Sequence, residues 1–205
     1  MNTSSVRTQD GVFKRVLWLY GLFMLLSNAA YLVAYYLLPE HWLLGSATQG
    51  PGRVIAASST FWSQVAMTFL FNFGLMIALS VWLNLFQVKG FPLGYLWLLS
   101  TAVMSGVTAG TNSFLQSNLT QINVRDGMAA NLSIGGLEFL AYILVIAATV
   151  SIAVYQWSSW IQLVPTKMKN FRDVRLSWTE VLCLLGGIVL LLIAAYRETM
   201  LARSL

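Results

Sequence analysis

Five long apolar segments, separated by shorter polar stretches, follow one another along the chain. They cover residues 16–38, 61–88, 91–114, 132–157 and 179–197. Each has about 20 residues or more, the length that an α-helix needs to cross the roughly 30 Å hydrocarbon core of a bilayer. The pattern predicts an all-α integral membrane protein. Its single polytopic domain, residues 16–205, is a bundle of about five transmembrane helices that follows an N-terminal segment, residues 1–15.

The connections between the apolar segments restrict the topology. Only Lys89 and Gly90 separate the second segment from the third, so these two helices must be antiparallel neighbours. The connection 39–60 contains a cluster of turn-forming residues, Gly45, Gly50, Pro51 and Gly52. We expect this loop and the polar loop 115–131 to lie on the outer side of the membrane.

Positive charges predict the orientation. With a cytoplasmic N-terminus, the inner segments hold Arg7, Lys14, Arg15, Lys89, Lys167, Lys169, Arg172 and Arg175. The outer segments then hold only Arg53, Arg125, Arg197 and Arg203. Cytoplasmic loops of membrane proteins carry an excess of Lys and Arg. The distribution therefore favours an N-terminus inside and a C-terminus outside.

Composition narrows the class of protein further. Hydrophobic residues make up 58% of the chain and charged residues only 9%, whereas about a quarter of an average soluble domain is charged. This excludes a soluble globular enzyme, a disordered tail and a nucleic-acid-binding module as the default interpretation.

The residue types that carry most enzyme chemistry are scarce. One histidine, His41, and one cysteine, Cys183, cannot form an ordinary His/Cys metal site within the chain. No Walker loop or dinucleotide-binding fingerprint occurs. The aspartates all fall in predicted loops, at Asp10, Asp126 and Asp173. We therefore expect no catalytic residues, no metal and no cofactor, and a protein that is not an enzyme.

The stretch after the fourth segment has a composition suited to a membrane surface. Residues 157–163 predict an amphipathic extension along the inner surface, followed by the basic stretch 167–175. Basic residues next to a membrane are attracted to anionic lipid by about 1 kcal/mol each. The alternative is that these charges only set the topology.

Glu138 is the one charged residue that we place well inside a predicted span, since the others are assigned to loops and span edges. A charged acid at the centre of a membrane helix costs about 2.5–3.5 kcal/mol on insertion scales, so its side chain must face protein or water. One interpretation is a proton, cation or ligand site. The other is a hydrogen bond to a neighbouring helix that fixes the bundle.

Polar residues recur at helical spacing in the second and third segments. The third carries a stripe made of Thr101, Ser105, Thr108 and Asn112, and the second carries Gln64, Thr68 and Asn72. Residues at these intervals share one helix face. Such a stripe either joins helices by hydrogen bonds or lines a water-filled path.

Small residues lie beside these stripes and predict close helix contacts. Gly106 and Gly110 form a small-x-x-x-small pattern, and Gly74 with Ala78 forms another. The glycines that we expect at helix-packing positions are Gly74, Gly90, Gly94, Gly106, Gly110, Gly135 and Gly136.

Short patterns in this central region resemble a known family. They are Phe61-Trp62-Ser63-Gln64, Gly74, Lys89-Gly90-Phe91-Pro92-Leu93-Gly94 and Gly135-Gly136-Leu137-Glu138. Their order, helix context and rough spacing resemble the stage II sporulation protein M family of small polytopic membrane proteins. That family has an Asn-rich helix start, an internal Gly, an Asn-Gly-x-x-x-Gly hairpin and a later His-Gly-x-x-Glu.

The resemblance covers roughly residues 60–155 and matches at Gly90, Gly94, Gly135 and Glu138. Lys89 replaces the family's Asn and Ile134 replaces its His, so the resemblance does not extend a His–Glu proton or metal role to this chain. It implies a non-catalytic membrane subunit. We expect a multi-pass protein of a prokaryotic cytoplasmic membrane.

Two functions remain open from the sequence. The first is a non-catalytic scaffold or assembly subunit of a larger membrane complex, whose partners are the lipid bilayer and other membrane proteins or a second copy, and not nucleic acid. The alternative is a small transporter or permease component, coupled to protons through Glu138.

Overall fold

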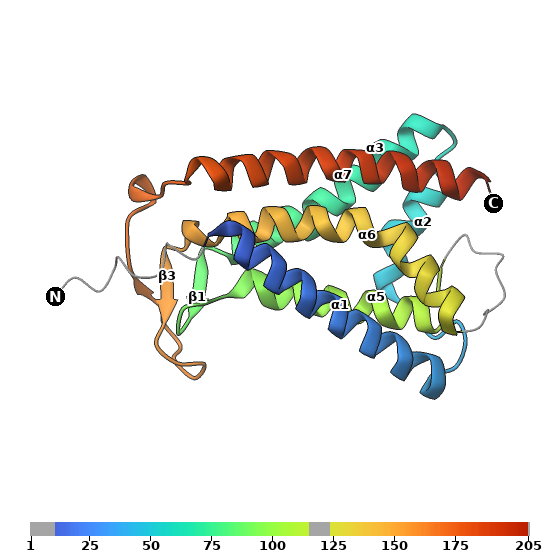
Figure 1. The fold of residues 1–205 in the computed structure, drawn as a ribbon, viewed down its shortest axis with the longest axis horizontal. Helices are drawn as coiled ribbons and strands as arrows, with labels where there is room; N and C mark the ends of the chain where they lie inside the picture. Colours follow the sequence, from blue (N-terminus) through green and yellow to red (C-terminus); the bar gives the residue numbers. More distant parts are fainter. Residues whose placement is uncertain (1–10, 115–123, 205) are drawn as a thin grey trace.

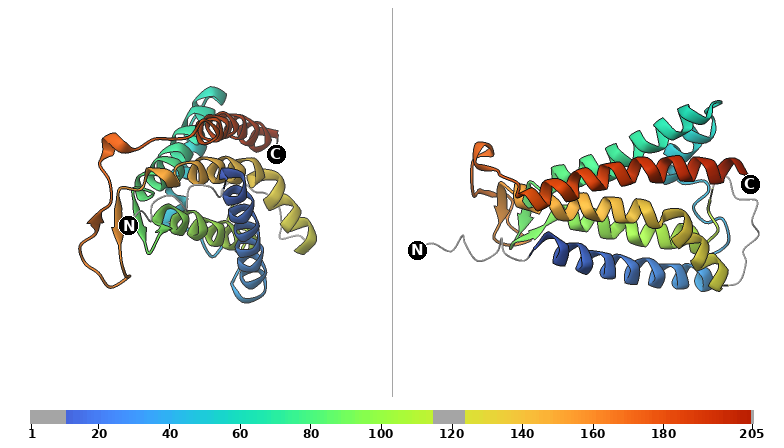
Figure 2. Two further views of the ribbon diagram at one scale, coloured as in Figure 1. Left: turned by 60° about the vertical axis from the view of Figure 1, so that its left-hand side comes forward. Right: turned by 45° about the horizontal axis from the view of Figure 1, so that its top comes forward.

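The computed structural model describes residues 11–114 and 124–204 of the chain, and these residues are mostly helical. Five helices are long and apolar enough to cross a membrane. They run side by side along one axis (Figure 1). A small β-sheet lies at one end of the bundle, which we call the sheet end. The C-terminus lies at the opposite end, which we call the far end (Figures 1 and 2).

The first, third, fourth and fifth of these spans are built on α1 (Val12–Leu37), α5 (Leu93–Gly110), α6 (Val124–Ala148) and α7 (Trp178–Ser204). The second consists of three consecutive parts, α3 (Phe61–Phe71), η2 (Asn72–Ala78) and α4 (Leu79–Leu83). Thr60 caps the start of α3 by accepting a hydrogen bond from the Ser63 amide at 3.2 Å, as polar N-cap residues do. The middle part, η2, is a π-helix.

The predicted helix ends were wrong at the sheet end. The second predicted segment reaches residue 88 and the third begins at 91, but the helix stops at Leu83 and the chain forms strands β1 (Phe86–Val88) and β2 (Phe91–Pro92). Lys89 and Gly90 have positive φ angles of 49° and 81°. Positive φ at both central residues is the geometry of a two-residue type I′ hairpin turn. The two helices are therefore neighbours, but a β-hairpin joins them.

The fourth predicted segment also ends in a strand. Residues 155–157 form β3 (Tyr155–Trp157), which pairs in parallel with β1 and antiparallel with β4 (Thr166–Lys167). The sheet has the order β2-β1-β3-β4. Residues 158–165 connect β3 to β4, so the predicted amphipathic extension over 157–163 is part of a β-hairpin.

The rest of the chain outside the spans is short. The connection after α1 contains η1 (Ala47–Gln49) and α2 (Gly50–Ala56). The predicted turn cluster at Gly50, Pro51 and Gly52 therefore begins a helix, because Pro51 occupies the first turn, where no amide donor is needed. Short 3₁₀ turns, η3 (Val150–Ile152) and η4 (Phe171–Asp173), lie at the sheet end.

Helix α6 is central in the bundle and contacts α1, α5 and α7. Its buried side chains Ile143, Val145 and Ile146 form the middle of the apolar core. Many large apolar side chains on the outer faces are exposed, among them Leu17, Leu70, Leu185 and Leu192. An apolar exterior on long apolar helices is what a lipid-embedded protein requires.

Candidate functional site

Two carboxyl groups from different helices meet inside the bundle. The side chains of Glu138 on α6 and Glu198 on α7 lie close enough to interact, and both residues are half-buried. Two neighbouring carboxyl groups can hydrogen-bond to each other only when one of them carries a proton, because ionised carboxylates only accept. Farther along α7, toward the sheet end, the two helices approach closely, since a Cβ on Gly187 would lie 2.9 Å from the Ala141 carbonyl oxygen.

Two further polar side chains complete this group. Asn72 Nδ2 donates to Glu138 Oε1 at 2.6 Å, and the buried Tyr142 lies beside Glu138. Among the described residues, Glu198 Oε2 is enclosed and has no hydrogen-bond partner. We call Asn72, Glu138, Tyr142 and Glu198 the carboxyl cluster.

Asn72 is placed by an unusual piece of backbone, because it is the first residue of the π-helix η2. Single π turns inside α-helices are rare and occur often at functional sites. The indole of Trp97 on α5 donates to the Leu75 carbonyl of η2 at 2.9 Å. A residue of a neighbouring helix therefore contributes to the hydrogen bonding of this segment.

Polar residues continue from the carboxyl cluster toward the far end of the bundle. Thr68 on α3 and Thr199 on α7 are buried. Beyond them, Arg203 Nε donates to Gln64 Oε1 at 2.8 Å, and Arg203 also contacts the Phe61 ring.

On the side of the carboxyl cluster that faces the sheet end, the neighbouring residues are apolar. Toward the sheet end, the residues that follow along the same three helices include Ile77, Ile146 and Leu191, and all three are buried core residues. The cluster therefore has polar neighbours on one side along the bundle and apolar core on the other.

The predicted polar stripe on α5 has a different arrangement. Thr101 Oγ1 donates to the Leu98 carbonyl at 2.7 Å, and Thr108 Oγ1 donates to the Met104 carbonyl at 2.9 Å. These hydroxyls satisfy carbonyls of their own helix, and half-buried Ser105 lies between them. Among the described residues, the hydroxyls of Thr101 and Thr108 bond carbonyls of α5 and not the carboxyl cluster.

Asn112 lies outside the helix, contrary to the prediction that residues up to 114 are helical. Helix α5 ends at Gly110, and Asn112 has a φ of 48°, in the left-handed region that Asn tolerates better than most residues. Its Nδ2 donates to Glu40 Oε1 at 3.1 Å, and its carbonyl contacts His41 Nδ1 at 2.9 Å. Asn112 therefore stabilises the loop that follows α1.

Three of the predicted packing glycines lie against another part of the chain. A Cβ on Gly106 would overlap the Ser27 carbonyl oxygen of α1, and one on Gly110 would lie 2.5 Å from the Tyr31 carbonyl oxygen. A Cβ on Gly94 would overlap the Asn84 side chain, which is itself fixed by donating to the Ile146 carbonyl and to Thr149 Oγ1.

The other predicted glycines have other environments. A Cβ would meet nothing within 4 Å at Gly74 or Gly136, and at Gly135 its nearest neighbours would be atoms of the Phe139 ring of the same helix. Gly90 serves the hairpin turn through its positive φ. The expected close contact at Gly74 is thus not present, because its position on the π-helix faces open space.

Sequence reasoning found Glu138 and Asn72 but missed Glu198. The predicted fifth segment ends at residue 197, which places Glu198 at the edge of the span. In the structure, α7 continues to Ser204 and carries Glu198 against α6. The sequence does contain a signal that the helix continues past Glu198. The uncharged residues Thr199, Met200 and Leu201 follow directly after Arg197 and Glu198.

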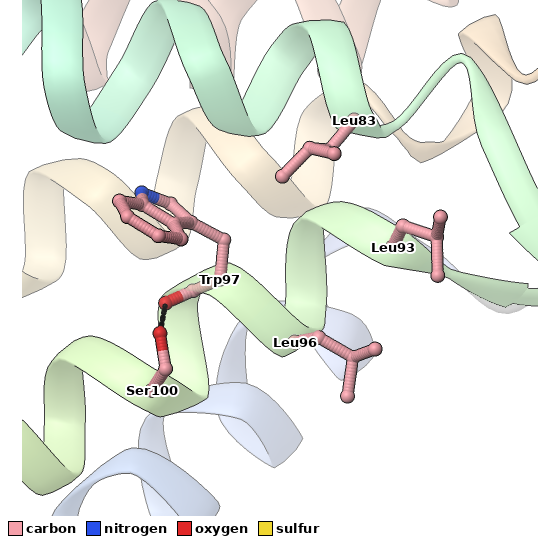
Figure 3. A pocket seen from close by; sticks show the side chains of 5 residues that line it. All are labelled: Leu83, Leu93, Leu96, Trp97 and Ser100. Atoms are coloured by element: carbon pink, nitrogen blue, oxygen red, sulfur yellow. Dashed lines mark hydrogen bonds between the residues drawn. The ribbon is translucent and has the colours of Figure 1, made fainter.

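A separate hollow on the surface is apolar and contains none of the carboxyl cluster. Leu83, Leu93, Leu96, Trp97 and Ser100 line it between α4 and α5 (Figure 3). The Ser100 hydroxyl donates to the Trp97 carbonyl at 2.7 Å. Its lining therefore offers an apolar surface and no free polar side chain.

Comparisons of the chain with protein-family models, with curated proteins and with solved structures find no match. The resemblance to the stage II sporulation protein M family stays a prediction. Within the described residues, no group of three or more His, Cys, Asp and Glu side chains is placed to hold a metal ion. The carboxyl cluster is therefore the feature of the described residues that bears on function.

Proposed function

We propose that the protein is a small transporter, or a permease component, that takes up and releases a proton at the Glu138–Glu198 pair. The observation that supports this proposal is that two carboxyl groups of different helices lie close together inside an apolar bundle, where Glu138 accepts from Asn72 and Glu198 Oε2 is enclosed. Ionisable residues within membrane helices are costly and usually mark ion or proton pathways.

The chemistry of the pair links protonation to helix packing. One shared proton lets the two carboxyl groups approach, with Asn72 as an additional donor to Glu138 and Tyr142 beside it. Loss of that proton leaves two negative charges side by side, which repel strongly in an apolar environment. Repulsion would separate α6 from α7, so the proton favours one helix arrangement over another, as a coupled transporter requires.

The surroundings of the pair suggest where the proton enters. Besides the pair, the charged and titratable groups on these two helices include Tyr142 on α6 and Glu180, Cys183, Tyr196, Arg197 and Arg203 on α7. Arg203 is exposed and bonds Gln64 near the far end, whereas the sheet-end direction is filled by buried apolar residues. Access from the far end needs less rearrangement, because polar side chains already line that direction.

The scaffold function that the sequence favours needs no carboxyl pair. Under that interpretation the Glu138–Glu198 contact would only stabilise the bundle, and a neutral amide that keeps hydrogen bonding would replace either residue. The two functions therefore differ in what Glu138→Gln and Glu198→Gln do.

Proton flux in liposomes separates these functions. We would reconstitute the purified chain with a pH-sensitive dye inside the vesicles and apply a potassium diffusion potential. The proposal predicts dye-reported proton uptake by the wild type and its loss, by tenfold or more, in Glu138→Gln and in Glu198→Gln. Glu40→Gln is the matched control, because Glu40 is an exposed glutamate of the connecting loop. Equal flux in all variants, or none in the wild type, would favour the scaffold.

A further inference from the structure

The β3–β4 hairpin exposes an unusually apolar loop at the sheet end. The exposed fractions are 60% for Trp160, 89% for Ile161, 94% for Leu163 and 72% for Val164. We call these four residues the apolar tip. They lie outside the spans and outside the core, so the packing of the bundle does not account for them.

The loop is held in this shape by its own polar groups. Gln162 Oε1 accepts from the amide and from the hydroxyl of Ser158, both at 2.7 Å. Gln162 Nε2 donates to the Val164 carbonyl at 2.6 Å. The polar side chain within the loop is thus used internally, which leaves the apolar tip to face outward.

The position of the hairpin matches the level of a membrane surface. It follows the end of α6 and precedes the start of α7, so it lies where two apolar spans end. Its strands run across the direction of the helices and away from the bundle to one side (Figures 1 and 2). A hairpin in this position runs along the bilayer surface when the helices cross the bilayer.

The charges around the apolar tip indicate which kind of partner the tip binds. Lys167, Arg172 and Arg175 are exposed on the segment that follows it. Asp173, the acidic residue among them, accepts from the Asn170 amide and side chain at 3.3 Å. Apolar side chains flanked by basic ones are the pattern of segments that lie in the interface of an anionic membrane.

We propose that the β3–β4 hairpin docks its apolar tip into the interfacial region of an anionic leaflet of the membrane that the helices span. The tip enters the boundary between headgroups and acyl chains, and Lys167, Arg172 and Arg175 contact lipid phosphates. This docking is independent of proton binding at the carboxyl cluster, which lies on other elements.

A fluorescent probe on the apolar tip tests this proposal in the full chain. We would attach an environment-sensitive fluorophore to Leu163→Cys in a Cys183→Ser background and reconstitute the protein in phosphatidylcholine vesicles, with and without phosphatidylserine. Quenching by a lipid with a shallow spin label reports insertion, and quenching by iodide reports exposure to water. Leu185→Cys on the exposed face of α7 is the control for deep insertion, and Ala57→Cys in the loop after α2 is the control for water.

If the tip docks, the shallow spin label should quench the probe at position 163, and the probe should be protected from iodide. Spin-label quenching and iodide protection should both increase when phosphatidylserine is present. Replacing Lys167, Arg172 and Arg175 by Gln should remove that increase, since each basic residue near an anionic surface changes the ratio of docked to free hairpin by about fivefold. The Leu185 probe should not change, which shows that the variant is folded.

Three results would overturn the proposal. Iodide quenching without spin-label quenching would leave the apolar tip in water, available to a soluble protein partner. Protection that rises with the protein-to-lipid ratio would make a second copy the occupant. Equal insertion with and without phosphatidylserine would remove the role of the basic residues.

Discussion

The α1–α5 contact and the meeting point of η2, α6 and α7 show two ways in which polar and small residues are used inside one bundle. Between α1 and α5, glycines bring backbones together, and the α5 hydroxyls bond carbonyls of their own helix. At η2, α6 and α7, polar side chains from three elements meet, and Asn72 of η2 donates to Glu138 of α6. Both regions have polar residues at helical spacing. Whether such a stripe only packs against its neighbour or forms a polar cluster with it depends on the side chains that the neighbouring helix presents.

The α1–α5 contact depends on the absence of a side chain at Gly106. We expect Gly106→Leu to destabilise the protein by about 3 kcal/mol, the upper part of the usual range for overpacking, because the new side chain would meet the α1 backbone. Unfolding in mixed detergent measures this free energy. Gly186→Leu is the control, since nothing lies within 4 Å of its Cβ position. Similar losses in both variants would contradict the close approach.

Asn72 tests the polar region in the same way. Asn72→Leu removes the donor to Glu138 Oε1, and a buried polar group left without its partner costs about 1–3 kcal/mol. We expect destabilisation near 2 kcal/mol together with a reduced proton flux. Unchanged flux and stability would mean that the amide has no part in the cluster.

The α5 stripe should be much less sensitive. Thr108→Val removes a hydroxyl that, among the described residues, bonds the Met104 carbonyl of its own helix. That carbonyl still accepts within the helix, so we expect a change below about 0.5 kcal/mol, as for most substitutions away from special features, and normal flux. A loss of flux in Thr108→Val would place the stripe on the proton route and remove the contrast between the two regions.

Much of this architecture was predictable from the sequence. The five apolar segments correspond to five helices of membrane-spanning length, because span length follows directly from hydropathy. Glu138 was found because an acid in an apolar run is conspicuous. Its partner was not, because Glu198 lies next to Arg197 near a helix end, and only the packing of α7 on α6 shows that it faces inward.

The sheet was missed for a related physical reason. Phe86, Val88, Tyr155 and Trp157 extend the apolar runs of two spans, and a short apolar stretch has no periodicity that separates strand from helix. The pairing of β1 with β3 joins residues far apart in the chain, and such long-range contacts are not recorded in local sequence pattern.

Infrared spectroscopy of the carboxylic C=O stretch tests the shared proton most directly, in an ester-free detergent where lipid carbonyls do not overlap. A protonated carboxyl band should be present in the wild type at neutral pH, shift on exchange into deuterated water, and disappear in the Glu138→Gln/Glu198→Gln double variant. Glu40→Gln should retain it. A wild type without this band at neutral pH, or a double variant that keeps it, would contradict a proton shared between Glu138 and Glu198.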